Sequence, residues 1–273
     1  MAYLTLKSGP RIFYRERGQG EPLLLIMGTG ADHTFWGPQI EAFSRTYRVI
    51  VYDARGIGRS ETISPPSSCT MATMAADAAG LLQALAIPRA HISGLSLGST
   101  VAQELALRHP RRVRSLQLHG TWARSDAWFR RMIDTLEYPI RKSDDRAAFI
   151  RSALMWILSP CFLAEQPALV REMEEAFVDG DYPPSQDGLL GHFHADKTHD
   201  ALDRLDQVQV PTLVTSGQCD AQVPQRYGRQ VAERIPGATW HLFQGPRASH
   251  LACMEMSEEF NRVGMDFLAK VGT

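Results

Sequence analysis

The sequence has no surplus of either charge. Its 273 residues contain 29 Lys and Arg against 30 Asp and Glu, which gives a formal net charge of −1. A balance this close to neutral provides no general attraction to nucleic acids or acidic membranes, which usually need a clear basic excess. Long apolar runs are also missing, since Leu23–Met27 is far shorter than the roughly 18 residues that cross a bilayer. We therefore expect no nucleic-acid partner and no membrane partner.

Cysteine is scarce, and no two cysteines have CxxC spacing. This pattern suits reduced thiols and argues against a disulfide framework or a zinc site. The N-terminus lacks the basic-then-apolar design of a signal peptide. Both absences predict a cytoplasmic protein. The four positions are Cys69, Cys161, Cys219 and Cys253.

What is present is a pattern of strands and helices. Tyr3–Leu6 and Arg11–Arg17 alternate in polarity and predict an antiparallel hairpin. Pro22–Met27 and Arg48–Tyr52 are apolar throughout, which is typical of strands that are covered on both faces in a largely parallel sheet. Strands and helices then alternate as far as Leu118, and this alternation predicts a doubly wound α/β fold.

The alternation stops after this point and returns near the C-terminus. Helical stretches such as Asp145–Ile157 and Pro167–Phe177 are separated by prolines and glycines. A strand at Pro211–Thr215 restarts the α/β pattern, which continues to a last helix near 255–270. We therefore predict one core domain, residues 1–120 and 206–273, interrupted by a helical lid at 121–205.

The segment 94–98 reads Gly-Leu-Ser-Leu-Gly and fits G-x-S-x-G between a predicted strand and a predicted helix. A serine in such a turn is strained, and the oxygen of Ser96 is expected above the carboxyl edge of the sheet. The helix behind it offers free N–H groups and a positive dipole end to a developing oxyanion. The alternative is an N-cap serine beside packing glycines.

A serine hydroxyl is a weak nucleophile at neutral pH, so this interpretation requires a histidine base and an orienting carboxylate. Asp220 follows the predicted strand Pro211–Thr215, and His250 follows the next strand. Both lie on loops at one rim of the sheet, and the chain order Ser, Asp, His is the expected one. The three residues together favour a catalytic role for Ser96.

At this point the sequence resembles the α/β-hydrolase superfamily over nearly its whole length. The segment 53–60 is similar to the family's D-x-R-G-x-G-x-S turn, and 28–30 (Gly-Thr-Gly) stands where the family places its oxyanion loop. The segment 198–205 and the hairpin start look most like the bacterial enol-lactonase and aminoacrylate-hydrolase group. The resemblance implies an α/β-hydrolase fold, a mostly parallel sheet with an inserted helical lid.

The resemblance also implies roles for individual residues. Ser96 would be the nucleophile, His250 the general base and acid, and Asp220 the group that fixes the histidine tautomer. The backbone N–H groups of Leu97 and Thr29 would form the oxyanion hole.

Three positions complicate these roles. Met27 replaces the histidine that commonly precedes Gly28 in this family, and the segment 246–250 lacks the usual Gly-x-Gly-His. Asp126 is a rival acid because some members carry the carboxylate after the preceding strand. The Gly-x-x-Asp loop with the following Val-Pro favours Asp220.

Two other patterns suggest cofactors. Gly28-Thr-Gly30 followed by Asp53 imitates a dinucleotide fingerprint, but His33 occupies the place of its third glycine. Asp53 is better interpreted as a turn residue. A second pattern is a histidine cluster without a nearby cysteine, which we interpret as exposed residues rather than as a metal site. We expect no metal and no organic cofactor. The clustered histidines are His192, His194 and His199.

Residues at the predicted lid entrance are candidates for substrate contact, namely Gly28, Trp122 and Arg124. An arginine here, Arg124, Arg130 or Arg131, would meet a carboxylate on the substrate. The alternative is that the basic stretch 108–151 and the acidic stretch 164–206 are solvated faces that pair across the lid. The aromatic residues of this region, Trp122 included, would also suit a lid core.

The function predicted from these observations is hydrolysis of a small carboxylic ester or lactone through an acyl-enzyme on Ser96. Two alternatives stay open: cleavage of an amide or carbon–carbon bond by the same triad, and a small-ligand receptor of the same fold. The expected partner is a small-molecule substrate, and the sequence leaves open whether the chain forms a homo-oligomer.

Overall fold

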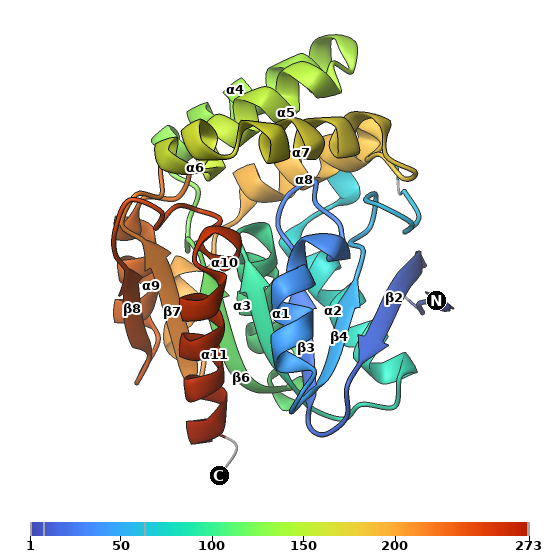
Figure 1. Cartoon of the computed structure of the whole chain (residues 1–273). Coiled ribbons are helices and arrows are strands. Elements are labelled where there is room, and N and C mark those ends of the chain that lie inside the picture. The colour runs from blue at the N-terminus through green and yellow to red at the C-terminus, as the bar shows by residue number, and fades with distance from the viewer. Residues whose placement is uncertain (1, 8, 63, 272–273) are drawn as a thin grey trace.

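The computed structural model describes residues 2–7, 9–62 and 64–271, and within them one eight-stranded sheet forms the centre of the molecule (Figure 1). The strand order is β1-β2-β4-β3-β5-β6-β7-β8. The strands are β1 (Ala2–Thr5), β2 (Arg11–Arg17), β3 (Pro22–Ile26), β4 (Arg48–Tyr52), β5 (Ala90–Leu95), β6 (Val113–His119), β7 (Thr212–Gly217) and β8 (Thr239–Phe243).

Strand directions follow the two sequence patterns. β1 pairs antiparallel with β2, and β2 pairs antiparallel with β4. The remaining neighbours are parallel. In the apolar strand β3, Leu23 and Leu25 pack into one core, whereas Leu24 and Ile26 pack into the other. A strand that faces two cores is apolar at every position, so the prediction of a mostly parallel, doubly wound α/β fold is confirmed.

Helices cover both faces of the sheet. α1 and α11 contribute Phe43, Phe260 and Leu268 to the core that contains Leu23, and α2, α3 and α9 cover the opposite face. The bounds of these helices are α1 (Gly37–Phe43), α2 (Met71–Ala84), α3 (Leu97–Arg108), α9 (Gln225–Arg234) and α11 (Ser257–Val271), with the short α10 (Ala252–Glu255) before the last one. Four 3-10 turns complete the connections in the part of the chain that the structure describes: η1 (His33–Trp36), η2 (Pro66–Ser68), η3 (Pro110–Arg112) and η4 (Leu202–Gln207).

Five further helices follow β6 and precede β7, and in Figure 1 they lie together over one end of the sheet. We call them the cap. The sequence pattern had indicated α5 and α7, whereas α4 contains an internal proline, Pro139, and α8 contains Gly188 and Gly191. Such residues interrupt a helical pattern in sequence without ending the helix. The cap helices are α4 (Ala127–Ser143), α5 (Arg146–Ile157), α6 (Pro160–Glu165), α7 (Pro167–Asp179) and α8 (Gln186–Thr198).

None of the helices in the described part of the chain is both long enough and apolar enough to span a membrane.

Candidate active site

Ser96 occupies a sharp turn between β5 and α3. Its backbone has φ 56° and ψ −125°, a conformation that L-residues rarely adopt. A Cβ atom on Gly94 would clash with the Gly98 carbonyl, and one on Gly98 would clash with the Ile26 carbonyl. The two glycines of G-x-S-x-G are therefore required by close backbone contacts. The strained turn lifts the serine side chain out of the sheet and into the cavity beneath the cap.

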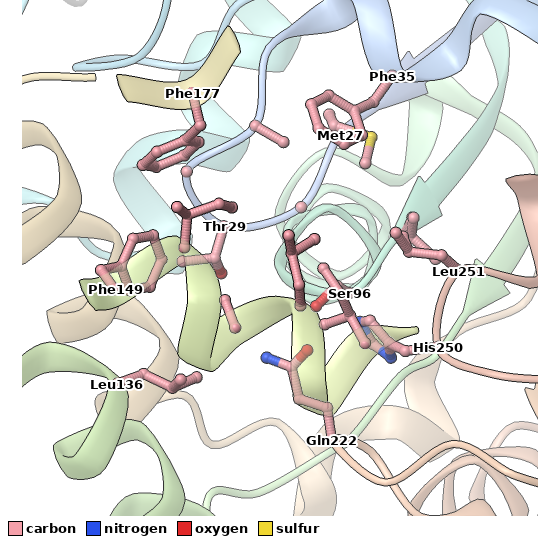
Figure 2. A pocket seen from close by; sticks show the side chains of 18 of the residues that line it. Met27, Thr29, Phe35, Ser96, Leu136, Phe149, Phe177, Gln222, His250 and Leu251 are labelled. Carbon is pink, nitrogen blue, oxygen red and sulfur yellow. The ribbon is translucent and has the colours of Figure 1, made fainter. Parts of the chain in front are cut away.

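His250 and Asp220 meet at the same edge. His250 Nδ1 lies 2.8 Å from Asp220 Oδ2, and both side chains are buried. Asp220 Oδ1 also accepts a hydrogen bond from the Val223 N–H at 2.7 Å, which fixes the carboxylate. A proton on Nδ1, donated to Asp220, leaves Nε2 as the basic nitrogen. Figure 2 shows the His250 ring and the Ser96 side chain together in the wall of one cavity.

Two loops hold the histidine in place. The Cys219 N–H donates to the Ala248 carbonyl at 2.8 Å, which joins the loop of Asp220 to the loop of His250. Gly120, at φ +52°, leaves room for the imidazole, because a Cβ atom there would lie 2.8 Å from His250 Cε1. The unusual segment before His250 therefore still brings the ring to Asp220.

The histidine loop is also bonded to the cap. Glu255 accepts hydrogen bonds from Ser249 Oγ at 2.6 Å and from the Ser159 N–H at 2.9 Å. The Leu251 N–H donates to the Ile157 carbonyl at 3.2 Å. Ser159 and Ile157 flank the junction of α5 and α6, so this junction and the residues around His250 form one hydrogen-bonded unit.

Asp126, the other candidate for the orienting carboxylate, has a structural role. It is the N-cap of α4 and accepts the Phe129 N–H at 2.9 Å and the Tyr227 hydroxyl at 2.8 Å. The carboxylate bonded to His250 is that of Asp220.

The predicted oxyanion donors are free of other bonds. Within the described chain no acceptor is bonded to the Leu97 or the Thr29 backbone N–H. Leu97 is the first residue of α3, where the N–H groups have no partner inside the helix. Gly28 lies beside Ser96, since a Cβ atom on Gly28 would come within 3.1 Å of Ser96 Cβ. The loop of Thr29 thus passes close to the nucleophile, and Thr29 lines the cavity (Figure 2).

Helix α8 of the cap holds this loop from behind. The Thr29 hydroxyl donates to Asp196 Oδ2 at 2.7 Å, and the Gly30 N–H donates to His192 Nδ1 at 3.3 Å. His192 Nε2 lies 3.1 Å from the Arg55 carbonyl. His192 and Asp196 are one helical turn apart and lie on one face of α8, so this helix connects the oxyanion loop to the loop that follows β4.

Burial sets the charge of these two side chains. It lowers the pKa of His192 to about 4, so the ring is neutral and its Nε2–H donates to Arg55. Burial raises the pKa of Asp196 to about 8, although the Thr29 hydrogen bond opposes this shift. Asp196 Oδ1 has no hydrogen-bond partner among the described residues. At neutral pH the carboxyl group is therefore mostly protonated.

The burial corrects one prediction from sequence. His192 and His199, which the sequence predicts to be exposed, are only 0% and 3% accessible. No sequence motif marks His192 or Asp196 as a functional residue. Their i, i+4 spacing is the one signal in the sequence that pointed to a shared helix face.

The cavity above Ser96 is almost entirely apolar. Its floor comes from the loops of the core, and its roof comes from α4, α5, α7 and α8 (Figure 2). Among the described residues, His250 is the only titratable side chain in its wall. The roof consists of Ile133, Leu136, Phe149, Ile150, Ala153, Leu154, Ile157, Met173, Phe177 and Phe193. Met27, in place of the family's histidine, adds a further apolar group to the wall.

Trp122 and Arg124 lie outside this wall, which corrects the prediction that they line the substrate site. Trp122 is 1% accessible, packs against Phe129 at 4.4 Å between ring centroids, and donates its indole N–H to Ser125. Arg124 pairs with Asp200 at 2.8 Å and with Asp203 at 2.6 Å. Arg124 thus joins the predicted basic stretch to the acidic one instead of meeting a ligand.

A second, more polar hollow adjoins the cavity. The two share residues of the oxyanion loop and of α7, among them Ala31, Met173 and Phe177. Its other side chains include Asp32, Arg59, Glu172 and Asp181. This hollow therefore borders the apolar cavity on the side of the oxyanion loop and α7.

Among the described residues, one group of side chains has the spacing of metal ligands: Asp32, His33 and Asp53. Asp53 Oδ1 already accepts the His33 N–H at 3.0 Å and faces His33 Nδ1 at 2.6 Å, and Asp53 Oδ2 accepts the Arg59 N–H at 2.9 Å. Both carboxylate oxygens are thus engaged with protein donors. Asp53 acts as the predicted turn residue, bonded to the segment that begins at Arg55.

Comparison with known proteins decides the family. A family model described as the alpha/beta hydrolase fold matches residues 21–255. The chain belongs to this family. A relative from Azorhizobium caulinodans, named "Putative carbamate hydrolase RutD", is 33% identical over 260 residues, which are 95% of this chain and 96% of the relative.

Solved structures agree with this alpha/beta hydrolase assignment. An enol-lactonase from Burkholderia xenovorans has a TM-score of 0.87 at 26% identity and covers 98% of this chain and 100% of its own. A thermophilic esterase from Thermogutta terrifontis has a TM-score of 0.88 at 26% identity and covers 100% of this chain and 99% of its own. The resemblance drawn from the motifs is confirmed, and the chain is a hydrolase of this family.

Proposed function

We propose that this hydrolase cleaves a small, uncharged carboxylic ester or lactone through an acyl-enzyme on Ser96. The observation that carries the proposal is the hydrogen-bonded pair of His250 and Asp220 beside a strained serine at the floor of a largely apolar cavity. Residues 121–205 would act as the lid. The expected partner is a small-molecule substrate.

The positions of these groups support the following mechanism. His250 Nε2 removes the Ser96 proton as Oγ attacks the ester carbonyl, and Asp220 stabilises the imidazolium that forms. The N–H groups of Leu97 and Thr29 bind the oxyanion of the tetrahedral intermediate. His250 then protonates the leaving alcohol, and it next activates a water molecule that releases the acid from Ser96.

The apolar cavity wall supports an uncharged substrate. A carboxylate or carbamate anion would be desolvated here without a cationic partner, which is strongly unfavourable. Arg124, the predicted carboxylate contact, is paired elsewhere. A neutral acyl chain would instead replace water against the apolar side chains of α4, α5 and α7.

The second candidate is hydrolysis of a carbamate, the activity in the name of the Azorhizobium relative. A neutral carbamate ester would use the same triad, as would the amide or carbon–carbon substrates. A panel of p-nitrophenyl butanoate, p-nitrophenyl hexanoate, a neutral p-nitrophenyl carbamate and a monoester of a dicarboxylic acid separates neutral esters, neutral carbamates and charged esters, and p-nitroanilides of the same acids test for amide hydrolysis. We expect the neutral carboxylic esters to have the highest kcat/KM.

The decisive variant is Ser96→Ala, with Ser143→Ala at the exposed end of α4 as its control. Ser96→Ala should lower kcat by about four orders of magnitude or more, whereas Ser143→Ala should match the parent protein. A fluorophosphonate should label Ser96, as mapped by mass spectrometry. Turnover that survives in Ser96→Ala, or an adduct on another residue, would refute the acyl-enzyme.

A further inference from the structure

The loop that holds Asp220 also carries a polar side chain that the proposed reaction does not use. Gln222 lies two residues after Asp220, and its side chain lines the cavity together with Ser96 and His250. Figure 2 shows the amide end of Gln222 directed toward Ser96. Gln222 is only 9% accessible, and its Oε1 has no hydrogen-bond partner within the described residues.

The short turn of this loop explains why Gln222 points into the cavity. The Val223 N–H is bonded to Asp220 Oδ1, and the Val223 side chain is buried in the core. With Asp220 directed toward His250 and Val223 into the core, the loop is fixed on both sides of Gln222. The orientation of Gln222 is therefore set by the same turn that places the catalytic acid.

The other polar groups around the cavity have partners or belong to the reaction. The Thr29 hydroxyl is bonded to Asp196, and the Gly30 N–H is bonded to His192. Ser96 and His250 are the nucleophile and base of the proposed mechanism. Among the side chains that the structure places in this wall, Gln222 is thus the remaining polar group with free capacity.

A buried amide carbonyl without a donor loses the hydrogen bond that it had in water. A ligand with a donor at this position restores the bond, whereas a ligand without one leaves the carbonyl unpaired. Discrimination by such a site is larger than discrimination by apolar contacts, because the penalty falls on the ligand that lacks the donor.

We propose that Gln222 is a specificity-determining residue that accepts a hydrogen bond from an N–H or O–H group next to the scissile carbonyl of the substrate. The proposal rests on the proposed function and narrows it. The substrate class is a neutral ester or lactone with an apolar chain and one hydrogen-bond donor near the carbonyl, such as a 2-hydroxy ester.

The test compares two esters that differ at one oxygen, which carries a hydrogen in methyl 2-hydroxyhexanoate and a methyl group in methyl 2-methoxyhexanoate, each as separate enantiomers. Their kcat/KM values are measured for the parent protein, for Gln222→Met and Gln222→Leu, and for Gln225→Met. Gln225 is exposed at the start of α9, so it is a matched control for the same change of side chain. Turnover of p-nitrophenyl hexanoate reports whether each variant has an intact triad.

We expect the parent protein and Gln225→Met to prefer one enantiomer of the hydroxy ester over its methoxy counterpart by at least about tenfold. In Gln222→Met and Gln222→Leu the ratio of kcat/KM between the hydroxy and the methoxy ester should fall to roughly twofold, because only the difference in size between the two substrates then remains. Both variants should still hydrolyse p-nitrophenyl hexanoate.

An unchanged ratio in both Gln222 variants, or no preference in the parent protein, overturns the role of Gln222 and leaves the ester hydrolase standing. A parent protein that hydrolyses none of the esters overturns both proposals. The two failures are thus distinguishable.

Discussion

Gly56 and Gly188 bring the backbones of the core and the cap into direct contact. A Cβ atom added to Gly188 would overlap the Gly56 carbonyl oxygen, and one added to Gly56 would lie 2.6 Å from Gly188 Cα. Gly191, one turn further along α8, leaves room for Cys69, because a Cβ atom added to Gly191 would lie 3.0 Å from Cys69 Cβ. Helix α8 is therefore seated on the core loops, close enough for His192 and Asp196 to reach the oxyanion loop.

Gly188→Ala tests the backbone contact between α8 and the core. The added methyl group has no space, so we expect a loss of about 1–3 kcal/mol in the free energy of unfolding, measured by urea denaturation. Gly37→Ala is the control, because nothing lies within 4 Å of a Cβ atom there. Equal unfolding midpoints for the two variants would contradict the close contact.

The hydrogen bond between Thr29 and Asp196 should affect the reaction rather than binding. In Thr29→Val the side-chain anchor of the oxyanion loop is lost, so we expect kcat to fall about tenfold or more with KM within about twofold. Thr29→Ser keeps the hydroxyl and should restore most of the rate.

Thr198→Val provides the control on the same helix, since the Thr198 hydroxyl is exposed and bonded to the His194 carbonyl within α8. It should leave both kinetic constants unchanged. A Thr29→Val variant with the parent kcat would show that the loop needs no such anchor.

Asp196 should also give the protein a distinct dependence of stability on pH. Burial raises its folded pKa to about 8, whereas the unfolded value is 3.8. Between these values the folded state keeps a proton that the unfolded state releases, so the contribution of Asp196 to stability falls as pH rises. Asn at this position keeps an acceptor for Thr29 and has no proton to lose.

Asp196→Asn should therefore become more stable relative to the parent as pH rises from about 4 to 8, by up to about 1.4 kcal/mol per pH unit. Urea midpoints of both proteins at pH 5, 6, 7 and 8 measure the difference. A difference that stays constant across this range would mean that the buried carboxyl is ionised throughout.

Asp220 and Asp126 are the two candidates for the carboxylate that orients His250, and we expect opposite effects from replacing them. Asp220→Asn removes the charge beside His250 Nδ1 and should lower kcat by about 10³–10⁴. Asp126→Ala removes an N-cap of α4 and should cost about 1 kcal/mol of stability with kcat nearly unchanged. Kinetics and thermal unfolding of both variants decide the matter, and a large loss of kcat in Asp126→Ala alone would reverse the assignment.

Local sequence was sufficient for the strands and for the turn at Ser96. Apolar runs such as Pro22–Ile26 identify doubly covered strands, and G-x-S-x-G describes a backbone geometry in which both glycines are sterically required. The loops of Asp220 and His250 follow from the rule that parallel strands end at the same edge.

The features of the site that the sequence does not predict depend on contacts between residues far apart in the chain. The partners of Arg124 are Asp200 and Asp203, more than 70 positions away, so its pairing was hidden from a local reading. The burial of His192 and Asp196 depends on the contact of Gly188 with Gly56, which no local pattern indicates. The unpaired carbonyl of Gln222 likewise depends on the cap helices, which form the roof of the cavity that Gln222 lines.

The hydrogen bonds from Ser159 to Glu255 and from Leu251 to Ile157 join the α5–α6 junction, which belongs to the roof of the cavity, to the loop of the general base His250. A displacement of the α5–α6 junction would drag the imidazole away from the hydroxyl that it must deprotonate. We therefore expect ligands to enter from the side of the hollow beneath α7, whose lining residues take part in neither of these bonds. An enzyme arranged in this way would be chemically idle whenever the roof is lifted at that junction, and bulk water admitted there would not be activated.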